Sequence, residues 1–242
     1  MDTSKHKPQQ EVILKVGLTP EHPCSYLPEQ KEQLLVMMDP GMFNAKDYER
    51  LLSLGFRRSG KDIYRPHCAQ CQACQSIRLA VNDVELSKSQ KRILAKNADL
   101  TVIIGHQDKP EYFRLYQTYI NSKHQQGSMY PASLEQYQHF ILAPWLTPHF
   151  IEIYSGQTLI AVAVTDVGSA SLSAMYTFYD PAYEQRSLGT FAILQQIQYA
   201  QSIGLPWLYL GYQVDQCKKM NYKTRFRPYQ RLIRGEWQIF SN

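Results

Sequence analysis

The sequence predicts an α/β (α+β) protein in which helices flank a mixed sheet, and two patterns carry this prediction. Three alternating apolar runs, joined by short turn-rich connections, are typical of an antiparallel meander, and they span residues 149–154, 158–167 and 170–179. A helical pattern of apolar residues then runs from Ile193 to Ile203, stops at Gly204 and precedes an apolar run at 207–210. A helix between two strands indicates a parallel crossover, so we expect both strand directions in one sheet.

The N-terminal half predicts shorter elements. Asn44 is placed to cap a helix that ends near Gly55, and residues 56–64 are typical of a strand or hairpin. Residues 77–84 alternate as a strand does, and a basic helix follows them. Two further helices are expected, one from Pro110 to Gln126 and one with a capping box of Ser133 and Gln136.

The loop that opens the helix after the meander suits an anion. Arg186, Ser187 and Gly189 combine a cation, a hydroxyl and close backbone approach at a helix N-terminus, where free N–H groups favour phosphate, although an ordinary turn also uses Ser and Gly. Antiparallel strands that feed one β-α-β unit with such a loop resemble the N-acetyltransferase type of fold. We therefore expect an N-terminal transferase domain with a cysteine cluster at 1–108, packed on an acetyltransferase-like catalytic domain at 109–242.

Composition excludes several classes of protein. The 242 residues are 44% apolar, which is enough for a core and too much for a disordered chain. The first ten residues are polar, and no run approaches the roughly 20 apolar residues of a membrane span. Five cysteines, three of them within seven residues, cannot form a disulfide framework. We therefore expect a cytoplasmic protein with no membrane partner.

Positive charge is concentrated near the C-terminus. The net charge of +5 is modest, yet residues 217–235 contain no acid and seven basic side chains: Lys218, Lys219, Lys223, Arg225, Arg227, Arg231 and Arg234. Aromatic residues alternate with them, as single-stranded nucleic acid requires for stacked bases beside a phosphate backbone. A solvated basic tail is the alternative interpretation.

The cysteine spacing is the sharpest local pattern. Cys68, Cys71 and Cys74 are separated by two residues each, so their thiolates can converge on one metal from a tight turn, with Cys24, His67 or His22 as a fourth ligand. Structural zinc and an iron-sulfur cluster are both compatible with this spacing. Reduced thiols packed without metal are the other interpretation.

A set of characteristic segments occurs in order along nearly the whole chain: residues 23–28, 55–60, 64–68 with Cys71 and Cys74, 77–78, 89–92, 97–100, 187–191, 211–212 and 219–223, with Phe226 and Pro228. Together they resemble the arginyl-tRNA-protein transferase family, and within it the bacterial aspartate/glutamate leucyltransferases. The resemblance implies transfer of leucine from leucyl-tRNA to proteins that begin with Asp or Glu, which creates a degradation signal. Arginine is the alternative donor.

This chemistry needs no cofactor, because the donor is an activated ester and the acceptor a protein α-amine. For the oxyanion we expect a donor from Tyr222 or Tyr212, although a core or stacking tyrosine is an equally good interpretation of each. Asp215 is placed to orient the amine, or only to cap a loop.

The acidic acceptor side chain requires a fixed cation, because a guanidinium pairs with a carboxylate through two parallel hydrogen bonds. Arg78, in a strand-like run after the cysteines, is the first candidate, with a surface salt bridge as the alternative. Lys223, Arg225 and Arg227 are further candidates that are also suited to tRNA phosphates.

Two other functions compete with this one. A coenzyme A-dependent acetyltransferase would use residues 185–190 to bind a pyrophosphate, but it leaves the basic segment without a role. A metal-stabilised RNA-binding module would use the cysteines as a knuckle, but it leaves the acyltransferase-like core without a role. Coenzyme A affinity without tRNA affinity, or RNA binding that ignores aminoacylation, distinguishes them.

Overall fold

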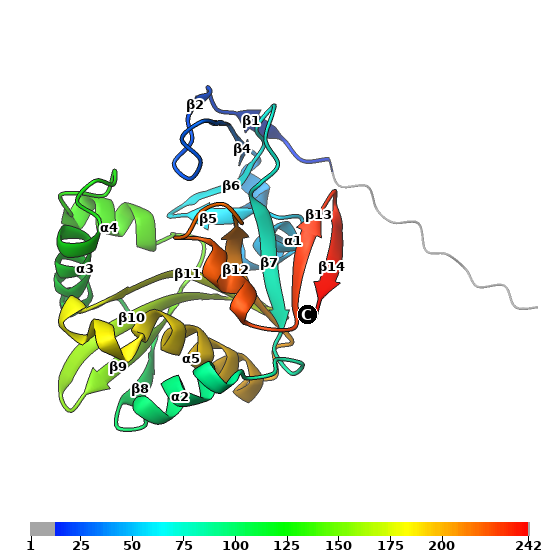
Figure 1. Cartoon of the computed structure of the whole chain (residues 1–242). Helices are drawn as coiled ribbons and strands as arrows, with labels where there is room; N and C mark the ends of the chain where they lie inside the picture. Colours follow the sequence, from blue (N-terminus) through cyan, green and yellow to red (C-terminus); the bar gives the residue numbers. More distant parts are fainter. Residues whose placement is uncertain (1–12, 242) are drawn as a thin grey trace, which may run out of the picture.

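An eight-stranded mixed sheet forms the centre of the protein in a computed structural model, which describes residues 13–241 (Figure 1). The strand order is β14-β13-β7-β12-β11-β10-β9-β8. The strands are β7 Gln75–Ala80, β8 Thr101–Gly105, β9 His149–Ser155, β10 Thr158–Val167, β11 Ser171–Tyr179, β12 Trp207–Gln213, β13 Tyr229–Ile233 and β14 Glu236–Phe240. The expected mixed α+β class is confirmed.

The predicted meander and crossover lie at the middle of this sheet. Strands β9, β10 and β11 pair antiparallel, and β11 then pairs parallel with β12. The crossover consists of the 3-10 helix η2 (Pro181–Arg186) and helix α5 (Leu188–Ser202). The elements that carried the resemblance to an N-acetyltransferase fold are therefore present in the expected order.

Alternation along β10 explains why both faces of the sheet are covered. Val162 and Val164 pack in the cluster that includes α3 (Pro110–Lys123) and α4 (Leu134–Ile141). The intervening Ala161 and Ala163 pack in the cluster with the start of α5. Successive strand residues point to opposite faces, so an unbroken apolar strand requires a helical layer on each side. Helix α2 (Lys88–Lys96) lies beside α5 (Figure 1).

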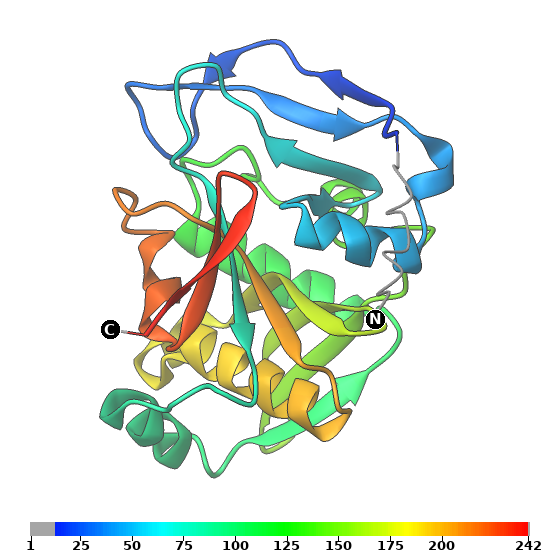
Figure 2. The same cartoon turned by 90° about the vertical axis from the view of Figure 1, so that its right-hand side faces the viewer.

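A second, four-stranded sheet lies at the other end of the protein from α2 and α5 (Figure 2). Its order is β1-β4-β6-β5, and a two-stranded ribbon of β2 and β3 lies near it. The elements are β1 Val16–Leu18, β2 His22–Pro23, β3 Lys31–Glu32, β4 Leu34–Met37, 3-10 helix η1 Pro40–Met42, α1 Ala45–Ser53, β5 Arg57–Ser59 and β6 Asp62–Pro66. The predicted helix, with Asn44 as its cap, and the hairpin of β5 and β6 are both confirmed.

The basic C-terminal segment is not a solvated tail, because most of it is built into the fold. It contains 3-10 helix η3 (Asn221–Arg225) and strand β13, whose partners are β7 and β14. Strands β8, β13 and β14 had no counterpart among the predicted elements. Strands β7 and β8 come from before residue 109 yet belong to the large sheet, and the boundary between residues 108 and 109 stays a prediction. Over residues 13–241, no helix combines the length and apolarity that a bilayer crossing needs.

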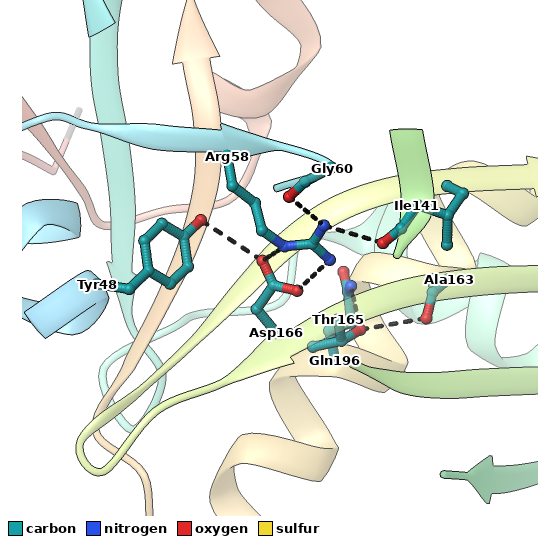
Figure 3. Close-up of polar contacts among 8 residues, drawn as sticks. All are labelled: Tyr48, Arg58, Gly60, Ile141, Ala163, Thr165, Asp166 and Gln196. Carbon is teal, nitrogen blue, oxygen red and sulfur yellow. Dashed lines mark hydrogen bonds and ion pairs between the residues drawn. The ribbon is translucent and has the colours of Figure 1, made fainter. Parts of the chain in front are cut away.

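A buried ion pair joins the two sheets (Figure 3). Arg58 on β5 donates from Nε and Nη2 to Asp166 on β10, at 2.8 and 2.6 Å, and both side chains are almost fully buried. Its Nη1 donates to the carbonyl oxygens of Gly60 and Ile141. The hydroxyl of Tyr48 contacts the same carboxylate at 3.4 Å. A guanidinium with this many acceptors fixes the hairpin of β5 and β6 against the large sheet.

Candidate functional site

A cavity of about 1450 Å³ lies between the two sheets. Its walls come from the cysteine-containing loops, the β5–β6 hairpin, β11, the C-terminal end of α3, the N-terminal end of α5, β12 and η3. The volume exceeds that of an ordinary small-molecule pocket, which is about 300 to 1,000 Å³. A cavity of this size can hold two substrates side by side.

The charged lining of the cavity is mainly basic. The basic residues are Lys31, Arg57, Arg58, Arg65, Lys219, Lys223 and Arg234, and the acidic ones are Glu32, Asp62 and Glu184. Arg58 already binds Asp166, and Glu184 binds Lys123 on α3. The remaining excess of positive charge favours anionic ligands.

Arg57 is buried in the wall without an acidic partner among residues 13–241. The residue is 5% exposed. Its guanidinium donates to the Ser76 hydroxyl and to carbonyl oxygens, including that of Gly211 at 3.5 Å. Its Nε is buried and has no hydrogen-bond partner within those residues. The guanidinium carbon lies 5.0 Å from the ring centre of Tyr209 and 5.6 Å from that of Tyr212.

Lys223 on η3 is the second buried cation of the wall without an acidic partner among residues 13–241, and it is also 5% exposed. Its Nζ donates to the carbonyl oxygen of Tyr212 at 2.7 Å and contacts that of Met220 at 3.4 Å. Burial, reinforced by the charge of Arg57, lowers the pKa of Lys223 to about 8. Both cations therefore lie against the same stretch of β12, where they bind neutral carbonyl groups.

The two candidate catalytic tyrosines differ in what their hydroxyls contact. Tyr212 is buried, and its hydroxyl donates to the carbonyl oxygen of Gly55 at 2.8 Å, with that of Tyr64 at 3.3 Å. Tyr222 also lines the cavity, and no hydrogen bond of its hydroxyl occurs within the described residues. Burial raises the pKa of both hydroxyls, so each stays protonated as a donor. Tyr222 is the better placed of the two, because its proton is not engaged with the backbone.

Arg78 does not line the cavity. Its guanidinium carbon lies 3.9 Å from the ring centre of Trp207 and 4.0 Å from that of Trp237, so it is sandwiched between two indoles. Its Nε donates to Gln230 at 2.9 Å and its Nη1 to Tyr209 at 3.1 Å. These contacts stabilise the sheet by cation–π attraction. The predicted contact of Arg78 with an acceptor carboxylate stays a prediction that this geometry does not favour.

Four other predicted residues also lie outside the cavity lining. Asp215 accepts two hydrogen bonds from Arg231, which holds the pKa of its carboxyl below the usual range. Arg186 forms a bidentate pair with Asp99. Arg225 is exposed, and the Arg227 guanidinium lies 5.6 Å from the Tyr229 ring. The sequence-based candidates that do line the cavity are Tyr212, Tyr222, Lys223, Ser187, Gly189, Cys24, Cys68, Cys71 and Cys74.

The start of α5 presents its free backbone donors to the cavity. Ser187 adopts the left-handed conformation (φ 56°), and its carbonyl accepts from the N–H groups of Thr190 and Phe191. The N–H groups of Leu188 and Gly189 are too early in the helix for an intrahelical partner. A Cβ at Gly189 would meet no atom within 4 Å, so the space beside it is open. The backbone at this helix start is compatible with an anion, but Arg186, the cation of the predicted site, pairs with Asp99, so anion binding by this loop stays a prediction.

The four predicted cysteine ligands share one part of the cavity wall. All are half-buried free thiols. Burial, followed by the proximity of Cys24, Cys68 and Cys71, raises the pKa of Cys74 to about 12. The donor chemistry suits zinc or an iron-sulfur cluster, but in residues 13–241 no three His, Cys, Asp or Glu side chains converge as metal ligands. The residues in this arrangement do not fit a bound metal.

Arg57 and the aromatic wall were missed by the sequence analysis. The wall residues are Tyr119, Phe140, Tyr176 and Tyr179, with Met129 beside them. The signal for Arg57 was the pair Arg57-Arg58 in a predicted strand, because neighbouring strand residues cannot both face water when a sheet is covered. That both are buried depends on the packing of one sheet against the other, which the local pattern does not contain.

Comparison with known proteins identifies the family. A model of the N terminus of arginine-tRNA-protein transferase matches residues 22–92, and one of the C terminus matches residues 111–233. Curated proteins named aspartate/glutamate leucyltransferase include those of Aeromonas hydrophila (56% identity over 95% of this chain and 96% of the relative), Pseudoalteromonas atlantica (50%; 94% and 98%) and Shewanella amazonensis (46%; 100% and 99%).

Among solved structures, the C-terminal domain of a lysylphosphatidylglycerol synthetase candidate from Agrobacterium fabrum is 13% identical, with a TM-score of 0.46 over 60% of this chain and 47% of that chain. That score is too low to add to the fold assignment. The identities with the curated relatives and the two matched models cover nearly the whole chain. The expected family is thereby confirmed: the chain belongs to the arginine-tRNA-protein transferase family.

Proposed function

We propose that this protein transfers leucine from leucyl-tRNA to the N-terminal Asp or Glu of acceptor proteins. The observation that carries the proposal is the sequence identity of 46 to 56% with curated aspartate/glutamate leucyltransferases over nearly the full chain. The basic cavity supports it, because both the 3′ end of a tRNA and an acidic acceptor are anionic. The product carries a new N-terminal residue that marks it for degradation, and the reaction takes place in the cytoplasm.

The chemistry asks little of the protein beyond binding and orientation. The bond between the α-amine nitrogen and the leucyl carbonyl carbon forms while the ester bond to the tRNA ribose breaks, and the ribose oxygen leaves as a hydroxyl. Roughly a tenth or more of an α-amine with a pKa near 7.7 to 8.0 is neutral at pH 7. Proximity of the two substrates supplies much of the rate. A strong general base is therefore unnecessary.

Two groups of the cavity are placed for the donor. The free N–H groups at the start of α5 suit a phosphate of the tRNA 3′ end. The hydroxyl of Tyr222 suits the tetrahedral oxyanion, because a single preorganised donor lowers such a barrier by about 3 to 4 kcal/mol. The wall of Met129, Phe140 and Tyr176 is apolar and suits leucine better than the charged side chain of arginine.

Metal binding by the cysteine cluster is a separate proposal. We propose that Cys24, Cys68, Cys71 and Cys74 take up zinc or an iron-sulfur cluster after a local rearrangement, because the arrangement described above does not fit either group. Metal analysis and the visible absorption spectrum of protein purified without oxygen distinguish the two. The absence of metal and of any absorption band would leave the thiols as ordinary packed cysteines.

The test of the main proposal is transfer of labelled leucine and labelled arginine from their charged tRNAs. Matched peptides begin with Asp, Glu, Asn or Gln, and acetyl-coenzyme A serves as a third donor. We expect leucine on the two acidic peptides alone. Transfer of arginine would change the assigned donor from leucine to arginine. Acetylation without aminoacyl transfer would favour the competing acetyltransferase function.

A further inference from the structure

Two buried positive charges in the cavity wall lack a counter-charge in the part of the chain that the structure describes. Arg57 and Lys223 are each 5% exposed, and within residues 13–241 neither lies within 4 Å of a carboxylate. Their partners are the Ser76 hydroxyl and backbone carbonyl oxygens.

Buried charges are normally paired with an opposite charge. The free energy lost when an ion leaves water is much larger than the free energy gained from hydrogen bonds to carbonyl groups. Two unpaired cations beside one another are costlier still, because they repel each other in a medium that screens poorly. Two such cations therefore serve a purpose other than the stability of the fold. An anion that enters the cavity supplies the missing charge.

The backbone of β12 brings these two cations together. The pairing of β12 with β7 is interrupted between Tyr209 and Tyr212, where a register shift marks a bulge. Gly211 lies in this bulge with φ +82°, and a Cβ there would meet no atom within 4 Å. The freed carbonyl groups of Gly211 and Tyr212 accept from Arg57 and Lys223 respectively. Bulges of this kind occur beside active sites, where they redirect backbone groups.

We infer that Arg57 and Lys223 bind the side-chain carboxylate of the acceptor's N-terminal residue, in the open space beside Gly211. This inference rests on the proposed function and names the residues that make it selective. The unpartnered Nε of Arg57 and the ammonium of Lys223 are the two donors. A hydroxyl donor, Tyr222, lies on the same short helix as Lys223 and lines the same cavity.

A carboxylate fits this position better than a tRNA phosphate does. Phosphates along a nucleic acid are bound by cations that the solvent reaches, and exposed basic residues such as Lys218, Lys219 and Arg225 supply these. Arg57 and Lys223 are enclosed, and each has few donors left after its backbone contacts. One carboxylate oxygen would meet the free Nε of Arg57, and the other would take the place of the long contacts that the Lys223 ammonium makes with the carbonyl oxygen and sulfur of Met220, at 3.4 and 3.7 Å.

The experiment compares acceptor selectivity in Lys223→Met with that of the unaltered protein. The measured quantity is the ratio of kcat/KM for a peptide that begins with Asp to kcat/KM for one that begins with Asn, with leucyl-tRNA as donor. We expect the ratio to fall about 10- to 100-fold, the effect of a lost hydrogen bond to a charged group. A merely structural role would lower both values equally and leave the ratio unchanged, and Lys223→Arg should restore it.

The control variant is Lys219→Met, which removes a cation from the exposed rim of the same cavity and should leave the ratio unchanged. Unaltered protein that transfers leucine without preferring Asp refutes the proposed acceptor and not the site alone. If Lys223→Met keeps the normal preference for the Asp peptide over the Asn peptide, the inference is refuted.

A crystal structure of the unaltered protein with the dipeptide Asp-Ala keeps the inference testable if the variant fails to fold. The carboxylate should lie between Arg57 and Lys223. A carboxylate on any other cation would contradict the inference.

Discussion

Arg57 and Arg58 are neighbours on one short strand, both buried, and their surroundings are opposite in kind. Arg58 has a carboxylate and two carbonyl oxygens around its guanidinium, and the Tyr48 hydroxyl donates to the same carboxylate (Figure 3). Arg57 has neutral partners and an unsatisfied Nε. The first arrangement serves the fold, because it joins two sheets through a fully paired charge. The second keeps an electrostatic cost in the empty protein that an anionic ligand removes.

The comparison also separates two uses of a lysine or arginine that sequence cannot distinguish. Where a buried cation is paired, removal of its partner lowers the stability of the protein. Where a buried cation is unpaired, removal of the cation itself weakens ligand binding. The same reasoning applies to Arg78, which has aromatic partners on both faces, and to Arg231, which has an exposed carboxylate. Tests that address Arg58, Lys223, Arg78 and Arg231 follow, from the largest expected effect to the smallest.

The largest effect is expected for Asp166→Asn. This change leaves the Arg58 guanidinium buried without its counter-charge, which should lower the free energy of unfolding by about 3 to 5 kcal/mol. Urea unfolding followed by circular dichroism measures it. A loss below about 1 kcal/mol would mean that the pair joining the two sheets adds little to the fold.

A pH effect on selectivity should follow from Lys223. Burial and the charge of Arg57 lower its pKa to about 8. Above that pH the ammonium loses its proton, so selectivity for Asp over Asn should fall about tenfold per pH unit. The α-amine of the Asp peptide has the higher pKa, because its side-chain carboxylate favours the protonated amine, so the ratio is corrected for the titration of each peptide measured separately. In Lys223→Arg the ratio should stay constant to pH 9.5, and a parallel fall there would show that another group titrates.

A smaller effect is expected for Arg78→Met. The change removes two cation–π contacts while keeping much of the apolar stem, so the unfolding free energy should fall by about 1 to 2 kcal/mol. The ratio of Asp to Asn transfer should change less than twofold. A fall in that ratio comparable with that of Lys223→Met would return Arg78 to the role that the sequence first predicted for it.

The smallest effect is expected for Asp215→Asn. Its carboxylate pairs with Arg231 at 2.8 Å, but the side chain is 64% exposed, and such pairs contribute about 0 to 1 kcal/mol. Thermal unfolding should shift by no more than a few degrees, with leucine transfer retained. A large loss of kcat with normal stability would support the predicted orienting role of Asp215.

The regular elements were predictable because their signals are local. Asn44 caps α1, and the alternating runs at β9 to β11 form adjacent antiparallel strands, as expected. Strand β13 was missed because its alternation of Arg231 with Leu232 was taken as part of a basic segment for nucleic acid. Its place beside β7 depends on a partner more than 140 residues earlier in the chain.

The site was predicted only in part, for a similar reason. Lys223, Tyr222 and the cysteines were recognised by residue type and spacing, and they do line one cavity. Arg57 became visible only when the small sheet was placed on the large one. Arg78 had the right charge in a rigid strand, but Trp207 and Trp237, from two other strands, enclose it. Residue type indicates what a side chain can do, and the packing determines which ones reach the cavity.

The pair of Arg58 with Asp166 also bears on how the protein emerges from the ribosome. The two residues are 108 positions apart, so at about 5 to 20 residues per second the arginine waits several seconds for its partner. During that interval the N-terminal sheet cannot bury Arg58 at a tolerable cost. We therefore expect the first sheet to complete its folding only after β10 has been synthesised, with the cavity the last part of the nascent protein to take shape.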